Sequence, residues 1–188
     1  FRRVLFRSGM PPVLPALDQS MAKASTDLAE LWLDVDRGSR NTPPSTNEIS
    51  GWSSGQTTCF LDALDVRAGD EPLRVSTLIA MDGLYGFSKS NNSEILYRFC
   101  ELSLASEDER IVPVVVRFVT SQGRMKFVRP LYKSLSQSKV GKDIALETFM
   151  KHKDTYHPIA SKMIAVDLKA VIMEESFSSN DSLFNPWL

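Results

Sequence analysis

The apolar residues of this chain recur at helical rather than strand spacing along nearly its whole length, and this periodicity restricts the fold more than any other feature. In the first stretch, apolar side chains three or four positions apart form one stripe, which consists of Met21, Ala24, Leu28, Leu31 and Val35. Such a stripe is typical of the buried face of an amphipathic helix. Asp18 lies just ahead of the stripe and predicts its N-cap.

The same periodicity predicts seven further helices, separated by short breaks that contain proline, serine or glycine. Their approximate residue ranges are 53–64, 71–84, 91–102, 111–119, 130–135, 143–151 and 158–170. Pro72, Pro130 and Pro158 each suit a first helical turn. Asn91, with Glu94 three residues later, resembles a capping box, and Gly86 predicts the end of the helix before it.

The segment Ile111–Val119 is the one place where a strand competes with a helix, because valine, isoleucine and phenylalanine are good strand formers. Three features favour a helix. The valines recur at helical spacing, Asp108 offers a cap, and Pro113 suits a first turn better than a central strand. We predict a helix that ends with Gly123 at its C′ position.

Short helices joined by short turns predict an all-α fold, an αα-superhelix of the armadillo or HEAT kind, with about eight or nine helices in two layers. We expect this domain to span residues 9–170. The Ser/Asn-rich residues 171–188 predict a disordered tail, in which Phe177, Phe184 and Trp187 are candidate docking residues. Residues 1–8, FRRVLFRS, resemble the read-through of a sequencing adapter, and we expect them to be foreign to the protein.

The composition limits the chemistry that this chain can perform. With 22 basic and 23 acidic side chains, the net charge is -1, which argues against a nucleic-acid partner. No apolar run approaches the ~20 residues of a membrane span. His152 and His157 are five apart and do not match the spacing of a helical zinc site, while Cys59 and Cys100 are expected to be core thiols. Because H-E-x-x-H and glycine-rich phosphate loops are also absent from the sequence, any reactive group must come from outside this chain.

The segment from Gly123 to Phe127, with the sequence GRMKF, contains the candidate binding residues Arg124 and Lys126. Side chains two positions apart share a side only in extended backbone, so a turn here would direct both cations the same way. A guanidinium beside an ammonium suits a carboxylate or a phosphate. The spacing alone also fits an exposed, solvated turn, and it does not decide between these two interpretations.

Longer motifs give the chain a family resemblance. They are GMPP at 9–12, NNSEILYRF at 91–99, QGRMKFVRPLYKSL at 122–135 and HKDTYHPIASKMIAVDLK at 152–169. In this order and spacing, they resemble the C-terminal domain of the leukotriene A4 hydrolase and aminopeptidase B family, the M1 zinc metallopeptidases. Val128 and Tyr132 depart from the pattern, since threonine and phenylalanine are expected there. Leu96 and Phe99 also differ, at positions where arginine and tryptophan are expected.

The resemblance implies that this chain is one domain of a cytoplasmic enzyme that hydrolyses peptides, and an epoxide as a second substrate class. The zinc and its H-E-x-x-H ligands would lie in a catalytic domain of the same polypeptide, so the chain alone is expected to be inactive and to bind no metal. Arg124 would recognise the carboxylate of a peptide or a fatty-acid-like substrate, and Lys126 would assist. A carboxylate anchored far from the scissile bond helps to orient the substrate.

The alternative hypothesis is a free-standing helical-repeat scaffold that binds a partner protein along its concave face. The two hypotheses predict different coding sequences upstream of Gly9. The enzyme hypothesis predicts an upstream coding region with H-E-x-x-H, whereas the scaffold hypothesis predicts a start codon close to Gly9.

Overall fold

The computed structural model describes the backbone of residues 20–181 and the side chains of residues 20–169. Every regular element in this range is helical. The α-helices are α2 (Ser20–Arg37), α3 (Ser54–Ala68), α4 (Val75–Tyr85), α5 (Ser93–Ala105), α6 (Val112–Ser121), α7 (Met125–Gln137), α8 (Lys142–His152) and α9 (Pro158–Asp181). Three single 3₁₀ turns join them, namely η1 (Phe87–Lys89), η2 (Glu109–Ile111) and η3 (Lys153–Thr155).

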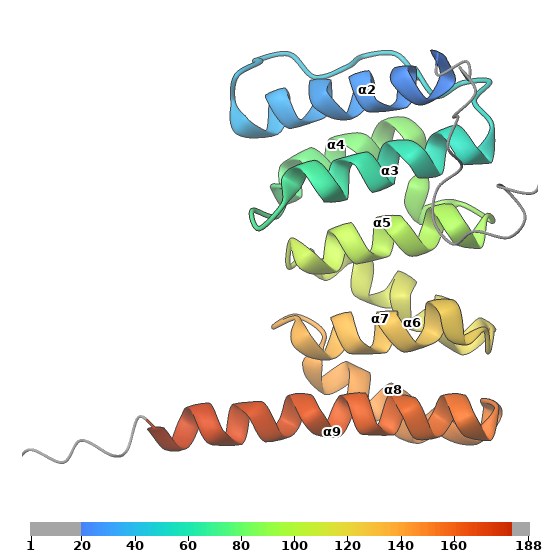
Figure 1. The fold of residues 1–188 in the computed structure, drawn as a ribbon, viewed down its shortest axis with the longest axis vertical. Helices are drawn as coiled ribbons and strands as arrows, with labels where there is room; N and C mark the ends of the chain where they lie inside the picture. Colours follow the sequence, from blue (N-terminus) through green and yellow to red (C-terminus); the bar gives the residue numbers. More distant parts are fainter. Residues whose placement is uncertain (1–19, 182–188) are drawn as a thin grey trace, which may run out of the picture.

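The helices stack in two layers, which confirms the all-helical prediction (Figure 1). One layer contains α2, α3, α5, α7 and α9 in chain order, and α4, α6 and α8 lie behind it. Each helix of the rear layer returns the chain, so the front-layer helices α3, α5, α7 and α9 all begin at the same edge (Figure 1). Contacts run mainly between neighbours, such as α2 with α3, α5 with α7, and α7 with α9.

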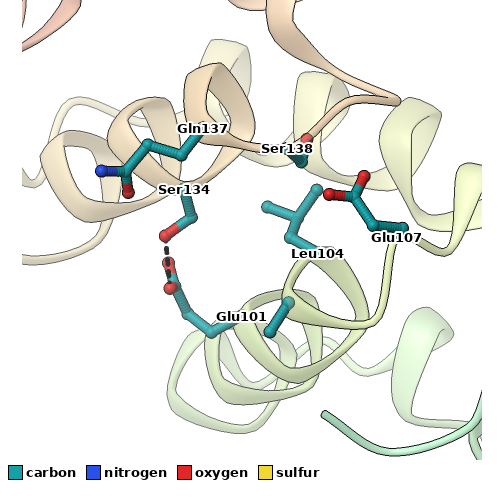
Figure 2. A pocket seen from close by; sticks show the side chains of 7 residues that line it. Glu101, Leu104, Glu107, Ser134, Gln137 and Ser138 are labelled. Atoms are coloured by element: carbon teal, nitrogen blue, oxygen red, sulfur yellow. Dashed lines mark hydrogen bonds between the residues drawn. The ribbon is translucent and has the colours of Figure 1, made fainter. Parts of the chain in front are cut away.

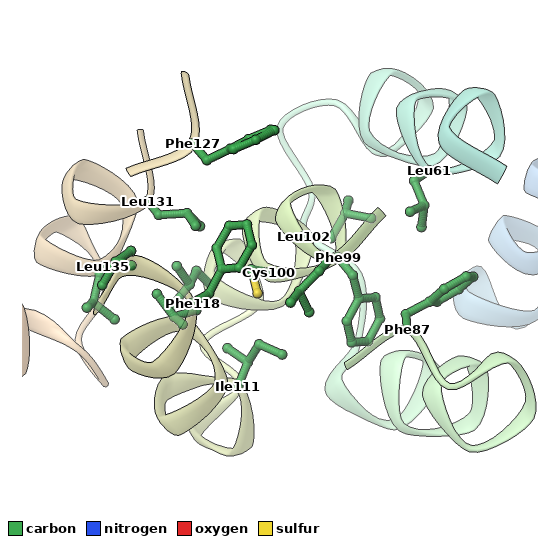
Figure 3. Packing of buried hydrophobic residues seen from close by; sticks show 14 of the residues in the cluster. Leu61, Phe87, Phe99, Cys100, Leu102, Ile111, Phe118, Phe127, Leu131 and Leu135 are labelled. Atoms are coloured by element: carbon green, nitrogen blue, oxygen red, sulfur yellow. The ribbon is translucent and has the colours of Figure 1, made fainter. Parts of the chain in front are cut away.

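The core between the layers is rich in aromatic rings (Figure 3). Phe87 and Phe99 lie with ring centroids 5.4 Å apart, and Phe118 and Phe127 are 5.9 Å apart. All four are at most 5% exposed. Burying a phenylalanine side chain stabilises a fold by about 1.5–3 kcal/mol, so this row of rings contributes much of the cohesion between successive helix pairs. Cys100 is fully buried among these rings, as expected for a core thiol.

Local signals place several helix ends where the sequence predicts them. Gly86 ends α4 with φ 69°, ψ 33°, a left-handed conformation that glycine adopts without steric cost. At α3, the Ser53 hydroxyl accepts from the Gln56 backbone N–H, and the Gln56 side chain accepts from the Ser53 N–H, which completes a capping box. Asp108 caps η2 by accepting from the Arg110 N–H.

The starts of α4 and α5 differ from the prediction. The predicted start of α4 at residue 71 is wrong, because residues 71–74 are tied to the end of α2. There the buried Asp36 carboxylate accepts from the Arg74 N–H at 2.8 Å, and Arg37 donates to the Glu71 carbonyl at 2.8 Å. The N-cap of α5 is Asn92 rather than Asn91, since the Asn92 Oδ1 accepts from the Glu94 N–H at 2.9 Å.

The segment 112–121 is helical, so the helix prediction for the valine-rich stretch is confirmed. Pro113 lies in the first turn of α6, where its missing N–H breaks no helical hydrogen bond. The helix ends at Ser121, and Gln122 is its C-cap, in extended backbone at φ -150°, ψ 160°, so Gly123 follows at the predicted C′ position.

Helix α9 continues to Asp181, so the predicted tail of residues 171–188 begins inside a helix. The sequence after Ala170 contains no glycine, and its first proline is Pro186, which explains why helix can continue. The prediction for Asp18 and that for docking by Phe177, Phe184 and Trp187 lie outside the described residues or side chains. None of the described helices is long and apolar enough to cross a membrane.

Candidate functional site

The GRMKF segment begins helix α7 and does not form the extended turn that we predicted. Arg124 is the N-cap, in extended backbone, and its carbonyl accepts from the N–H groups of Phe127 and Val128 at 2.9 and 3.1 Å. Lys126 therefore lies within the first helical turn. The prediction that a helix starts at Pro130 is wrong, because Pro130 lies inside α7, where its ring costs the helix one N–H donor.

The two candidate cations are brought together by a buried phenylalanine and not by extended backbone. The Arg124 guanidinium carbon and the Lys126 Nζ each lie 5.2 Å from the centroid of the Phe127 ring. This distance is within the range of cation–π attraction. The ring is 1% exposed and packs against Tyr97 and Phe118, at centroid distances of 5.4 and 5.9 Å. The two positive charges therefore share a fixed aromatic support.

The two cations differ in what they bind. The Lys126 ammonium donates to the Glu94 Oε1 at 2.5 Å. The Arg124 side chain is exposed, and within residues 20–169 it makes no hydrogen bond or ion pair with a side chain. An arginine without an internal carboxylate partner keeps its planar fork of donors available for an external anion.

Glu94 connects Lys126 to further charges on neighbouring helices. Its Oε2 accepts from Arg98 at 2.8 Å, and the Arg98 Nε donates to Asp62 on α3 at 2.6 Å. We call the row of Asp62, Arg98, Glu94 and Lys126 the charged ladder. Hydrogen bonds from Lys126, and then from Arg98, lower the pKa of Glu94, so Glu94 is ionised at neutral pH.

A groove of about 550 Å³ lies between the start of α5 and the end of α6. Its lining includes the cations Lys89 and Arg117 and also Gln122, which precedes Arg124 by two residues in the sequence. No lining residue is acidic, and the remainder of the lining is mostly hydroxyl and amide side chains. The lining of this groove thus favours an anionic group over a cation.

A second cavity, of about 250 Å³, lies between α5 and α7 and has the opposite charge (Figure 2). Here the Glu101 Oε2 accepts from the Ser134 hydroxyl at 2.6 Å, while its Oε1 is buried without a hydrogen-bond partner. Burial raises the pKa of this carboxyl group. Glu107 also lines the cavity, but within the described residues no group of three or more metal-ligating side chains could hold a metal ion.

The histidines lie where a structural role is sufficient. His157 precedes α9, and its Nδ1 accepts from the Ile159 N–H at 3.2 Å, so it serves as a helix-entry residue. His152 is the last residue of α8. The described residues therefore do not fit the zinc that the resemblance implies for the whole enzyme.

Sequence reasoning identified Arg124 and Lys126 but missed the partner of Lys126. Glu94 was assigned to a capping box, yet with Asn92 as the N-cap it is only the second helical residue, and its side chain extends toward α7 instead. The two residues are 32 positions apart, so no local pattern joins them.

Comparison with known proteins gives the family. A model of the family described as leukotriene A4 hydrolase, C-terminal, matches residues 52–168. This chain belongs to that family.

Particular relatives agree with this assignment. Leucine aminopeptidase 2 from Neurospora crassa is 36% identical over 161 residues, which are 86% of this chain and 23% of that protein. Leukotriene A-4 hydrolase from Xenopus laevis is 32% identical over 163 residues, which are 85% of this chain and 26% of that protein. The structure of native yeast LTA4 hydrolase matches at 26% identity with a TM-score of 0.73, over 89% of this chain and 28% of that one. The chain thus spans about a quarter of the length of its curated relatives.

Proposed function

We propose that this chain acts as the C-terminal helical domain of a cytoplasmic zinc aminopeptidase and that Arg124, assisted by Lys126, binds the carboxylate of the substrate. The substrate would be a peptide or a fatty-acid-like carboxylate. The catalytic domain of the same polypeptide would be the partner of this chain and would supply the zinc and the chemistry of hydrolysis.

The observation that carries this proposal is that Arg124 is exposed and, among the described residues, unpaired. Its guanidinium is exposed, packs over the buried Phe127 ring, and has no acidic partner among the described side chains. It also lies at the N-terminus of α7, where the helix dipole favours negative charge. A bidentate bond from this guanidinium would fix the end of a substrate remote from the scissile bond, and such binding energy orients the reacting group.

Arg129 provides a matched control, because it is an arginine on the same helix with its charge already paired. It forms two hydrogen bonds to Asp167, at 2.6 and 3.0 Å. In the full-length enzyme, we expect Arg124→Ala to cost about 2–4 kcal/mol of transition-state stabilisation for peptides with a free α-carboxylate. Arg129→Ala should cost much less.

The assay compares kcat/KM for a tripeptide with kcat/KM for the same tripeptide amidated at its C-terminus. Loss of activity in Arg124→Ala should be confined to the free acid. Equal losses in the Arg124→Ala and Arg129→Ala variants, or equal losses for acid and amide, would contradict the anchor role. The isolated chain should not cleave either peptide, and cleavage by the isolated chain would show that the catalytic group is not elsewhere.

A further inference from the structure

Lys126 already has a carboxylate partner, and this partner lies on a different helix. The Glu94 Oε1 on α5 accepts the ammonium proton at 2.5 Å. This carboxylate has the same chemistry as the substrate group that Lys126 would assist. An ammonium has three N–H donors, so Lys126 can contact a second carboxylate while it keeps the first.

Glu94 is held in this place from its other side. Its second oxygen accepts from Arg98, and Arg98 in turn donates to Asp62, so the carboxylate is fixed between two cations. The Glu94 and Arg98 side chains are 33% and 24% exposed, whereas those of Lys126 and Asp62 at the ends of the ladder are 51% and 56% exposed. The inner part of the ladder is therefore the less hydrated part, where ion pairs are less screened.

Arg124 shares the Phe127 ring with Lys126 but lies outside the charged ladder. Both cations thus contact the same aromatic ring, but within residues 20–169 only Lys126 is already paired with a carboxylate of the chain. We propose that Glu94 is a specificity-determining residue, an internal carboxylate that competes with the substrate carboxylate for Lys126. An incoming carboxylate binds mainly to Arg124 and reaches Lys126 only by sharing it with Glu94.

This inference rests on the proposed function, and it sets a limit on the strength of the anchor. The negative charge of Glu94 opposes every anion that approaches Lys126, and it persists at neutral pH because neighbouring cations lower the pKa of Glu94. Removing that charge should therefore tighten the binding of a substrate carboxylate rather than weaken it.

The test uses the full-length enzyme that contains this chain, with trialanine and trialanine amide as substrates. Glu94→Gln keeps the shape of the side chain and removes the charge. We expect it to lower the KM for trialanine by roughly two- to fivefold, the range that corresponds to a partly exposed ion pair, with kcat unchanged. The KM for trialanine amide, which has no carboxylate, should stay the same.

Asp62→Asn is the matched control, because it removes the same charge from the other end of the charged ladder, on α3. It should leave both KM values unchanged. In a Lys126→Met background, Glu94→Gln should no longer lower the KM for trialanine, because the cation for which Glu94 competes is gone. Urea unfolding of each variant checks that a change in KM does not come from loss of fold.

The outcomes separate this inference from the proposed function. If Arg124→Ala leaves kcat/KM for trialanine unchanged, the anchor itself is refuted. If Arg124→Ala lowers that kcat/KM while Glu94→Gln raises the KM for trialanine or leaves it alone, the anchor stands and the competition is refuted. Equal effects of Glu94→Gln and Asp62→Asn, or equal effects on acid and amide, would also overturn the role of Glu94.

Discussion

A buried pair of tyrosines near the end of α6 allows a sharp test of the packing. The Tyr156 hydroxyl donates to the Val119 carbonyl at 3.0 Å and lies 2.9 Å from the Tyr132 hydroxyl. Because the single proton of Tyr156 goes to Val119, Tyr132 must donate to Tyr156. Val119 is in the last turn of α6, where carbonyls lack helical donors, so Tyr156 satisfies a group that the helix itself leaves unpaired.

Removing the Tyr156 hydroxyl therefore leaves more buried polar groups unpaired than removing the Tyr132 hydroxyl does. Tyr156→Phe strands the Val119 carbonyl and the Tyr132 hydroxyl, both without water, since Tyr132 is 0% and Tyr156 6% exposed. At about 1–3 kcal/mol for each of the two buried unpaired groups, this substitution should cost about 2–6 kcal/mol of unfolding free energy. Tyr132→Phe leaves the Tyr156 proton satisfied and should cost about 1 kcal/mol or less.

Urea unfolding followed by circular dichroism measures both free energies, at any pH near neutrality because burial raises the pKa of both tyrosines. The double variant should be less unstable than the sum of the single variants, since removal of Tyr132 also removes one stranded hydroxyl. A Tyr132→Phe variant at least as unstable as Tyr156→Phe, or strict additivity, would refute this account. The resemblance places phenylalanine at position 132, which agrees with a low cost there.

Three further substitutions test other features. Burial raises the pKa of Glu101, so its ionisation destabilises the folded state as pH rises above the ordinary pKa of a glutamate. Glu101→Gln removes this charge and should raise the unfolding free energy at pH 7 by about 1 kcal/mol. In urea titrations, the stability gained by Glu101→Gln should be smaller at pH 5 than at pH 7. A larger gain at pH 5 would contradict this account. Gly141→Ala should cost about 1–3 kcal/mol, since its Cβ would lie 2.2 Å from the Leu135 Cδ1 and 2.9 Å from the Leu135 carbonyl oxygen. An unchanged Tm would contradict that clash. Asp36→Ala should cost about 1–3 kcal/mol and expose the Arg74 amide, which hydrogen exchange detects as lost protection.

Features of the fold that depend on neighbouring residues in the chain could be predicted from the sequence. Helical periodicity gave the helical class, and Gly86 marked the end of α4, whereas Asp108 caps η2, the turn just before α6, rather than α6 itself. Each of these signals acts within a single turn, through a backbone conformation or a side-chain cap. Such effects do not need knowledge of which helices pack together.

Features that depend on distant residues could not be predicted. The start of α4 is set by Asp36, which lies 38 residues before Arg74. Pro130 suggested a helix start, but α7 begins five residues earlier, at Met125, and tolerates the proline inside it. Arg124 and Lys126 were recognised by motif, whereas the Glu94 contact that distinguishes one from the other exists only once α5 and α7 are stacked.

The common direction of the front-layer helices also affects the electrostatics of the anchor. Because α3, α5, α7 and α9 begin at one edge, their N-terminal amides line that edge (Figure 1). Each helix N-terminus carries a partial charge of about +0.5, effective within its first turn. Arg124, the N-cap of α7, lies at one of these positive ends, whereas α4, α6 and α8 bring their negative C-terminal ends to the same edge in the rear layer. The up-and-down path of the chain thus sorts the helix ends by layer, so an anion at this edge is favoured over the front layer, where Arg124 lies, rather than over the rear layer.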